Sequence, residues 1–324
     1  MTLDAKILSA LREADETGIT AAILAAKAGT NFTVITQRVA ELCRIGYDIE
    51  ETPHLGYRLL SAPDVLHADD LLSRLAPRRV IGRDIQVFQQ TSSTNDVVEK
   101  LARDGVNEGV VIFAESQTAG RGRLGRKWIS PAEQGLWFSV LLRPSMPPGL
   151  ATQLTIAAAT AVARAIRAET GLMPQIKWPN DILVQNKKVV GILTELSAEV
   201  DRVRYVVIGI GVDVNVIDFP AEIAAIATSL AEAAGKNFIR AEIAAAILTE
   251  LDVDYARVTR GEFAALAEEW ERQCITLGRR VQIHIGERTV TGRAESLDSD
   301  GALLLRTDHG HLERIVGGDV VLET

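Results

Sequence analysis

The spacing of apolar residues divides the chain into three parts, and the first covers residues 1–62. Apolar side chains recur here at helical spacing in three segments, and two short runs of strand-like alternation follow. The expected helices are 3–15, 20–28 and 34–45, with the turn Gly29-Thr30-Asn31 before the third, and the expected strands are 47–51 and 57–60, joined by Pro53-His54-Leu55-Gly56. Three helices and a hairpin in this order predict a winged helix-turn-helix.

The second part, residues 76–272, mixes strand-like runs with alanine-rich helical segments and follows a linker over residues 63–75. The expected strands are 85–89, 110–115, 136–142, 174–178, 182–185, 189–196 and 203–212, with Asn186-Lys187 as the turn between the fifth and the sixth. The expected helices are 94–103, 150–170, 221–234, 240–258 and 262–273. This order predicts helices packed around a mixed, largely antiparallel sheet.

The third part, residues 273–324, changes to short alternating runs separated by glycine and aspartate turns. The expected strands are 280–285, 289–297, 302–307 and 312–316. Short strands of this kind predict a small β-barrel-like domain. The whole chain is therefore expected to be a multidomain protein of the α+β class.

Composition narrows the class of protein. The 324 residues suffice for two or three domains, and the net charge of −8 gives no general attraction to nucleic acid or anionic lipid. Cys43 and Cys274 lie far apart and lack metal-ligand spacing, so neither a disulfide framework nor a cysteine metal site is expected. The sequence carries no recognisable signal peptide and no run of about 18 apolar residues, which predicts a cytoplasmic protein without a membrane partner.

The charge of the first part leaves its role in DNA binding open. Residues 1–62 hold six Lys or Arg and eight Asp or Glu, whereas phosphate contacts supply most non-specific affinity for DNA. Two interpretations remain: this part binds operator DNA, or it is an accessory domain that has kept the fold and lost the operator. The polar residues that would face a DNA groove are Asn31, Thr33, Thr36, Gln37 and Arg38.

The most distinctive local sequence is GRGRLGRKW at residues 120–128, which we call the basic glycine loop. Glycine allows the backbone to approach a ligand closely, and arginine offers forked donors to phosphate or carboxylate. These properties predict a loop that closes over a phosphorylated, ring-bearing ligand. The Gly-x-Gly-x-x-Gly spacing also matches a dinucleotide-binding turn, but the four cations and the following Ser130-Pro131 disfavour the helix that such a turn requires. A solvated basic loop is the other alternative.

Three further polar clusters lie in the second part of the chain. Residues 91–95 (TSSTN) follow an expected strand and suit either hydrogen bonding to a small polar ligand or helix capping. Residues 177–181 (KWPND) form a dense polar corner that is also typical of a simple turn. In the third cluster, strand alternation leaves Lys187 in the turn and directs Lys188 inward, toward a carboxylate or phosphate site; a solvated turn lysine is the alternative.

Together, four motifs resemble those of the biotin protein ligases, in the class that carries an N-terminal winged helix. They are Ser93-Thr94-Asn95, the basic glycine loop, Lys177-Trp178-Pro179-Asn180-Asp181, and Lys188-x-x-Gly191-Ile-Leu-x-Glu195. Each motif is weak alone, but all four occur in order and the resemblance covers the full length. It implies a winged helix, a catalytic domain of the class II synthetase-like type and a C-terminal SH3-like β-barrel.

The resemblance also implies roles for single residues. Lys188 resembles the lysine that binds the biotin carboxylate and the α-phosphate, while Arg123 would lie near the phosphate and Arg121 near the biotin carboxyl. The implied catalytic residues are Lys188, Arg123 and Asp181. The implied contacts to biotin or biotinyl-AMP are Ser93, Thr94, Asn95, Gln117, Gly120, Arg121, Gly122, Arg123, Trp128, Lys188 and Gly191. The implied nucleotide contacts are Arg126, Trp128, Asn180, Asp213 and Asn215.

The implied reaction has two steps. Biotin and ATP, with Mg²⁺ but without a fixed protein metal site, give biotinyl-5′-AMP and pyrophosphate, and a lysine of a biotin carboxyl carrier protein domain then takes the biotin. A biotin-responsive repressor that binds operator DNA, and a homodimer, are further implications. A lipoate ligase and a ligand-sensing transcription factor without catalysis remain alternatives.

The sequence departs from the family pattern at three places. Asp213 stands where Gly-x-Gly-x-Asn is usual, which removes an amide donor and adds a negative charge near the nucleotide, unless Asn215 compensates. Phe32 stands where a cation often begins the recognition helix, and the wing at 53–56 lacks the usual lysine. The last two departures weaken the case for DNA binding.

Overall fold

The computed structural model describes residues 1–53 and 55–322, so His54 of the expected wing and the last two residues of the expected third part lie outside the described residues. The chain forms two compact units. Unit 1 comprises Met1–Arg78 with Ile239–Ala245, and unit 2 comprises Arg79–Phe238 with Ala246–Thr324.

Unit 1 has the expected helical start and hairpin. Its elements are α1 (Leu3–Ala14), the 3-10 turn η1 (Asp15–Thr17), α2 (Ala21–Ala28), α3 (Phe32–Arg44), β1 (Asp48–Thr52), β2 (Gly56–Ser61) and α4 (Ala68–Arg74). Thr2, Thr20 and Asn31 cap the three main helices, because each side chain accepts a hydrogen bond from the backbone N–H three residues further on. The antiparallel β1–β2 pair follows α3, as the periodicity predicts.

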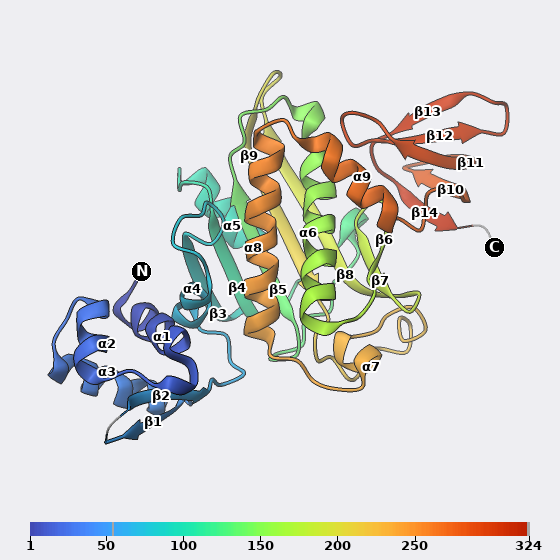
Figure 1. The fold of residues 1–324 in the computed structure, drawn as a ribbon. Coiled ribbons are helices and arrows are strands. Elements are labelled where there is room, and N and C mark those ends of the chain that lie inside the picture. Colours follow the sequence, from blue (N-terminus) through green and yellow to red (C-terminus); the bar gives the residue numbers. More distant parts are fainter. Residues whose placement is uncertain (54, 323–324) are drawn as a thin grey trace. The chain divides into compact units, whose positions relative to one another are not determined.

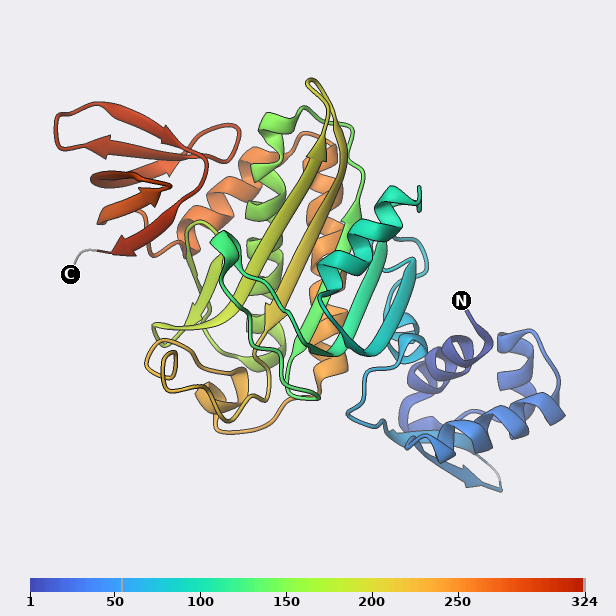
Figure 2. The ribbon, with the colours of Figure 1, turned by 180° about the vertical axis from the view of Figure 1, so that it is seen from behind.

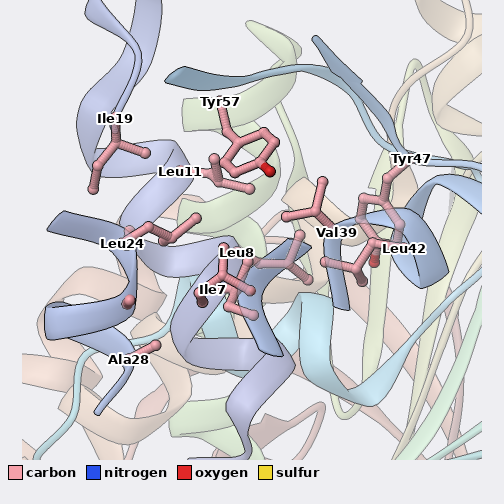
Figure 3. Close-up of a cluster of buried hydrophobic side chains, with 13 residues drawn as sticks. Ile7, Leu8, Leu11, Ile19, Leu24, Ala28, Val39, Leu42, Tyr47 and Tyr57 are labelled. Carbon is pink, nitrogen blue, oxygen red and sulfur yellow. The ribbon is translucent and has the colours of Figure 1, made fainter. Parts of the chain in front are cut away.

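Apolar side chains from all three helices and the hairpin form the core of unit 1 (Figure 3). Members of this core are Ile7, Leu8 and Leu11 of α1, Leu24 of α2, Val39 and Leu42 of α3, and Tyr47 and Tyr57 near the hairpin. Helix α4 lies in the segment expected as a linker. Its Asp70 is nearly buried and pairs with Arg12 of α1 and Arg74, which fixes this short helix against α1.

Unit 2 is built on a seven-stranded sheet with the order β3-β4-β5-β9-β8-β7-β6. The β3–β4 pair is parallel and the other described neighbours are antiparallel, which confirms a mixed, largely antiparallel sheet. The strands are β3 (Asp84–Thr91), β4 (Val110–Gln117), β5 (Leu136–Leu142), β6 (Gln175–Lys177), β7 (Asp181–Val184), β8 (Lys187–Ala198) and β9 (Val203–Val212).

Helices cover both faces of this sheet. Helix α5 (Thr94–Arg103) packs on β4, β5 and β9, whereas α6 (Thr152–Thr170) packs on β6, β7 and β8 (Figures 1 and 2). Arg164 of α6 pairs with carboxylates of α8 (Arg240–Thr259) and α9 (Phe263–Gln273), which joins these three helices. The helix Pro148–Thr170 is long and apolar enough to cross a membrane, but 67% of its most apolar window is buried, as in the core helix of a globular domain.

The structure corrects two expectations in unit 2. The helix expected over 221–234 is wrong: turns occupy 221–226, and only α7 (Leu230–Ala234) is helical, with Ser229 as its N-cap. The turn before β8 consists of Gln185 and Asn186, both at positive φ, while Lys187 already pairs with Val184. A two-residue hairpin turn requires this backbone at both positions, and asparagine tolerates it better than lysine.

The last part of the chain forms an antiparallel sheet of order β13-β12-β11-β10-β14. Its strands are β10 (Arg280–Ile285), β11 (Arg288–Leu297), β12 (Leu303–Thr307), β13 (Leu312–Ile315) and β14 (Asp319–Leu322). The first four match the expected strands closely, and β14 was not expected. The described pairings give an antiparallel sheet, and closure into a barrel stays a prediction.

Candidate functional site

The basic glycine loop is a short hairpin that stands on the sheet of unit 2. Trp128 donates its backbone N–H to the Gly120 carbonyl (2.9 Å), and Gly122 donates to the Arg126 carbonyl (2.7 Å). A Cβ at Gly120 would lie 2.5 Å from the Trp128 carbonyl oxygen, so the close approach of the two loop ends requires glycine. Residues 120–128 contain a 3-10 turn, η2 (Arg123–Gly125), and no α-helix, which makes the dinucleotide-binding interpretation wrong.

The Trp128 ring lies on two glycines that face each other across neighbouring strands. Gly191 of β8 is the register partner of Gly211 of β9, and a Cβ at either position would lie 2.5–2.6 Å from the ring. The indole Nε1 is buried and has no hydrogen-bond partner among the described residues. The paired glycines therefore form a flat floor on which a ring can lie, and the loop brings the indole to it.

A β-bulge directs Lys188 into the same site. The register of β7 against β8 shifts between Ile182 and Leu183, so Lys188 and the next residue leave strict alternation. The Lys188 Nζ lies 2.6 Å from Asp181 Oδ1 and 5.2 Å from the centroid of the Trp128 ring. The inward lysine predicted from alternation is thus half-buried beside a carboxylate, rather than solvated in the turn.

Arg123 approaches from the tip of the loop. Its guanidinium donates to Asn180 Oδ1 and to the Gly318 carbonyl, each at 3.3 Å. Both acceptors are neutral oxygens, and burial lowers the pKa of Arg123 because its charge is partly removed from water. The adjacent Arg126 pairs with Asp319 of β14. Arg123 is therefore a half-buried cation with the Asp181 carboxylate and the Arg126 cation nearby, and its direct hydrogen bonds to neutral oxygens leave it available to an anionic ligand.

The polar cluster before and within α5 does more than cap a helix. Ser93 occupies the N-cap position, but its side chain makes no capping hydrogen bond. Gln117 Oε1 accepts from the Thr94 N–H (2.9 Å), and the hydroxyl groups of Thr94 and Ser139 lie 2.6 Å apart. Asn95 Oδ1 accepts from Ser139 (2.5 Å). The structure thus joins Thr94, Asn95 and Gln117 in one hydrogen-bonded group.

Sequence reasoning missed Ser139, although a signal was present. It is the one hydroxyl residue in the apolar strand LWFSVLL of β5 and is fully buried. Buried polar groups are normally hydrogen-bonded, so a lone serine in such a strand indicates a polar partner on a neighbouring element. Asp96 was also missed; it pairs with Arg121, which in addition contacts Glu195.

Most of the residues predicted to contact DNA have side chains that form hydrogen bonds or ion pairs within unit 1. Arg38 pairs with Asp4 and Glu41, and Gln37 donates to Glu41 at 3.2 Å. Asn31 caps α3, and Thr36 donates to the Phe32 carbonyl. Thr33 is exposed at the start of the helix. The charge of Arg38 is thus balanced by protein carboxylates instead of being directed at phosphate.

Comparison with known proteins decides the family. A curated relative from Bacillus subtilis, named bifunctional ligase/repressor BirA, is 38% identical over 91% of this chain and 90% of its own length. The chain belongs to the biotin protein ligase family. The biotin–[acetyl-CoA-carboxylase] ligase of Mycobacterium tuberculosis is 36% identical over 74% of this chain and 89% of its own length. The chain is therefore a ligase.

Family models and a solved structure agree with this placement. Residues 87–213 match the biotin/lipoate A/B protein ligase family, 276–323 the biotin protein ligase C-terminal domain, and 4–58 a helix-turn-helix domain. The biotin protein ligase from Aquifex aeolicus in complex with biotin and ATP is 32% identical, with a TM-score of 0.64 over 74% of this chain and 99% of that chain.

In this biotin protein ligase, the side chain of Asp213, which replaces the asparagine of the usual family pattern, is buried. Asp213 is 6% exposed, and burial raises the pKa of its carboxyl well above the ordinary value, although nearby Lys188 opposes the shift. Asn215 is held elsewhere, because its amide exchanges two hydrogen bonds with the backbone of Phe238. A protonated Asp213 would regain one donor at this position, in place of the amide of asparagine.

A cavity of about 700 Å³ opens beside the ligase site rather than beneath its loop. Its walls come from α5 and from the ends of β8 and β9, and Glu195 belongs to both the cavity and the loop contacts. The wall arginines Arg103, Arg202 and Arg204 pair with Glu99 or Glu199. The fourth wall arginine, Arg143, donates to three backbone carbonyls, so all four cations have protein partners.

We expect the Gly211→Ala substitution to displace Trp128 from the glycine floor. A Cβ here meets indole atoms at 2.5 Å, and overpacking of this kind costs about 1–3 kcal/mol. Trp137, Trp178 and Trp270 are buried, so acrylamide quenching of tryptophan fluorescence should rise mainly through Trp128. Gly149→Ala, where a Cβ meets nothing within 4 Å, is the matched control. Equal quenching in both variants would contradict the floor.

We expect Asp213→Asn to stabilise the ligase at neutral and higher pH. Because burial raises the pKa of Asp213, its ionised form is disfavoured in the folded state, and this penalty disappears as pH falls toward the ordinary aspartate value. When measured from pH 8 to pH 4, the difference in unfolding temperature between variant and parent should be largest above the raised pKa of Asp213 and should shrink as the pH falls below it toward the ordinary aspartate pKa. Asp218→Asn, at an exposed position nearby, should show no such trend. A constant difference across this range would rule out the shift.

Proposed function

We propose that the chain activates biotin with ATP to biotinyl-5′-AMP and transfers the biotin to a lysine of a biotin carboxyl carrier protein domain. One observation carries this proposal: Lys188, Arg123 and Trp128 converge from a strand and a loop above the Gly191–Gly211 floor. The Trp128 indole, held on this floor, offers a flat face to the uncharged rings of a ligand, and the two cations suit its carboxylate and phosphate.

The first step brings two anions together, and the site supplies the opposing charge. Lys188 is held 2.6 Å from Asp181, so an incoming carboxylate and α-phosphate exchange one anionic partner of the lysine for another. Arg123 has neutral acceptors that a phosphate oxygen can replace without breaking an ion pair. Positive groups that are already fixed in place stabilise the charge that develops at phosphorus.

Mg²⁺ fits this arrangement as a partner of ATP. Asn180 and Asp181 offer side-chain oxygens beside Lys188 and Arg123, and Mg²⁺ is commonly bound by one or two such ligands plus substrate phosphates. No cluster of three His, Cys, Asp or Glu side chains that could hold a metal ion occurs among residues 1–53 and 55–322. Bound there, the ion would neutralise phosphate charge.

The second step requires that water be excluded while an amine enters. The basic glycine loop covers the floor and limits hydrolysis of the mixed anhydride. The carrier lysine amine attacks the biotin carboxyl carbon, so that an amide forms, the bond to the phosphate breaks and AMP leaves. We propose that Asp181 accepts the proton from the incoming lysine, because it is a carboxylate at the site and Lys188 can then hold the phosphate of the departing AMP.

The finer architecture belongs to the same proposal. We assign a winged helix to residues 1–62, a linker to 63–75, a class II synthetase-like catalytic domain to 76–272 and an SH3-like barrel to 273–324. The hairpin β1–β2 after α3 and the five-stranded C-terminal sheet support these assignments. A homodimer is the proposed assembly.

We expect a carrier domain incubated with the ligase, biotin and Mg·ATP to gain the mass of one biotin on one lysine. Lys188→Ala should lower biotin-dependent pyrophosphate exchange at least about 100-fold, because it removes a fixed cation from the transition state. Arg123→Ala should bind biotin but release the adenylate faster.

Lys187→Ala is the matched control for that experiment. Lys187 is the neighbouring lysine, and its Nζ lies 4.0 Å from Glu232 Oε1 instead of beside Asp181. This variant should keep near-parental exchange. Supplying lipoate in place of biotin tests which of the two substrates the chain uses, because lipoate ligases share the catalytic-domain architecture. Mass gain with lipoate alone would overturn the substrate assignment, and near-normal exchange in Lys188→Ala would overturn its role.

We also propose that unit 1 represses transcription by binding operator DNA in response to biotin. The helix-turn-helix match over residues 4–58 and the name of the relative from Bacillus subtilis support this second function. Because Arg38 is already ion-paired, recognition would rest on Thr33 and Gln37 near the start of α3. Few phosphate contacts are then available, so affinity should depend weakly on salt.

Selection from a random duplex library, with biotin and Mg·ATP present, should enrich one sequence. Gln37→Ala should weaken binding to the selected duplex by about 1–3 kcal/mol and relax one base position. Glu13→Gln, exposed on α1, should leave the selected sequence unchanged. No enrichment with or without ligand would leave the accessory-domain interpretation of unit 1 as the correct one.

A further inference from the structure

Arg121 has two carboxylate partners, from two elements that flank the loop. Its guanidinium pairs with Asp96 of α5 and lies 3.2 Å from Glu195 of β8. Arg121 is the second residue of the loop and forms an isolated bridge with Lys127, so these two contacts fix the base of the hairpin. The charge of Arg121 is thus directed at the protein rather than toward the glycine floor.

Glu195 is also hydrogen-bonded to the pocket interior. Asn95 Nδ2 donates to Glu195 Oε2 at 2.6 Å, while Asn95 Oδ1 accepts from the Ser139 hydroxyl at 2.5 Å. Since the single Ser139 proton is used there, the Thr94 hydroxyl supplies the proton of their 2.6 Å contact, and Gln117 Oε1, 3.3 Å from Thr94 Oγ1, is a second acceptor for it. The chain of hydrogen bonds therefore has one direction, from Thr94 through Ser139 and Asn95 to Glu195.

The same polar group reaches the other end of the loop. Gln117 Oε1 accepts from the Thr94 backbone, and Gln117 Nε2 donates to the Ser130 hydroxyl at 2.9 Å. The Gln117 N–H donates to the Ser130 carbonyl (3.4 Å), two residues after Trp128. Both ends of the basic glycine loop are thus connected to the Thr94–Gln117 pair.

Gly209 makes this connection possible. A Cβ at Gly209 would lie 2.2 Å from Asn95 Oδ1, so Asn95 can lie flat on β9 only because this residue has no side chain. Asn95 is 3% exposed, and an alternative orientation would leave a buried amide without partners. Gly209 therefore leaves room for Asn95, and the hydrogen bonds to Ser139 and Glu195 fix the orientation of its amide.

We propose that Asp96 and Glu195 form a clasp on Arg121 that keeps the basic glycine loop closed over the adenylate, and that the Thr94–Ser139–Asn95 chain sets the position of Glu195. Asp96 and Glu195 are positioning residues, because they act on the ligand through Arg121. This inference rests on the proposed ligase function and deepens it: the clasp forms from the protein's own residues, and the closed clasp retains the intermediate.

The test uses the full chain with Glu195→Gln and Asp96→Asn, which keep shape and remove charge. Each variant should release biotinyl-AMP about fivefold faster, the effect of losing one partly exposed ion pair, while the rate of adenylation of bound substrates stays within about twofold. Glu199→Gln is the matched control, because Glu199 pairs with Arg202 and Arg204 on the adjoining hairpin, away from the loop.

Coupling to Arg121 separates a clasp from a general structural role. In an Arg121→Met background, the added Glu195→Gln should have no further effect on release. Additive effects, or unchanged release in both single variants, would overturn the clasp.

A measurement without ligand keeps the clasp distinguishable from the ligase proposal. Trypsin should cleave after Arg126 and Lys127 about fivefold faster in Glu195→Gln and Asp96→Asn than in the parent or in Glu199→Gln. Failure of the parent chain to form any adenylate would refute the ligase proposal, whereas equal cleavage in all variants would refute the clasp.

Discussion

The close approach of Trp128 to the paired glycines of β8 and β9 is the constraint on which the site depends. Gly191 and Gly211 face each other in register, and neither position can hold a Cβ while the indole lies there. The bulge at Lys188 is three residues before Gly191, so the same stretch of β8 aims the cation and supplies the floor. A shift of register by one residue would send both features to the opposite face of the sheet.

The four cations of the basic glycine loop are not equivalent. Arg121 and Arg126 have carboxylate partners, in Asp96 with Glu195 and in Asp319. The described hydrogen bonds of Arg123 go to neutral oxygens, although it is the more buried of these arginines. Ion pairs therefore hold Arg121 and Arg126 on the two arms of the loop, while Arg123 at the tip retains unused capacity for an anion. This division explains how so basic a segment is accommodated in a protein of net charge −8.

Local patterns predicted the sheet well because its strands are short apolar runs bounded by turn residues; β5 and β9 match the expected ranges residue for residue. Helix α4 was not predicted, since its stability comes from the pairing of Asp70 with Arg12 of another helix, which no local pattern contains. The helix prediction failed over 221–229 for the opposite reason. The alanines of this segment favour a helix, but the Ile226 carbonyl accepts from the Lys188 N–H and the Thr228 N–H donates to the Lys188 carbonyl. Tertiary contacts override propensity in both cases.

The candidate site shows the same limit at the level of single residues. The motifs contained Lys188, Arg123, Trp128 and Gly191, because these are the residues expected to contact the ligand. They did not contain Ser139 or Asp96, which matter only through partners 44 and 25 positions away in sequence. Asp213 combines both aspects, since its identity is visible in the sequence but its charge is set by burial in the fold. Because burial raises the pKa of the Asp213 carboxyl, its neutral form is favoured there, and this form resembles the amide of the family pattern more closely than a carboxylate does.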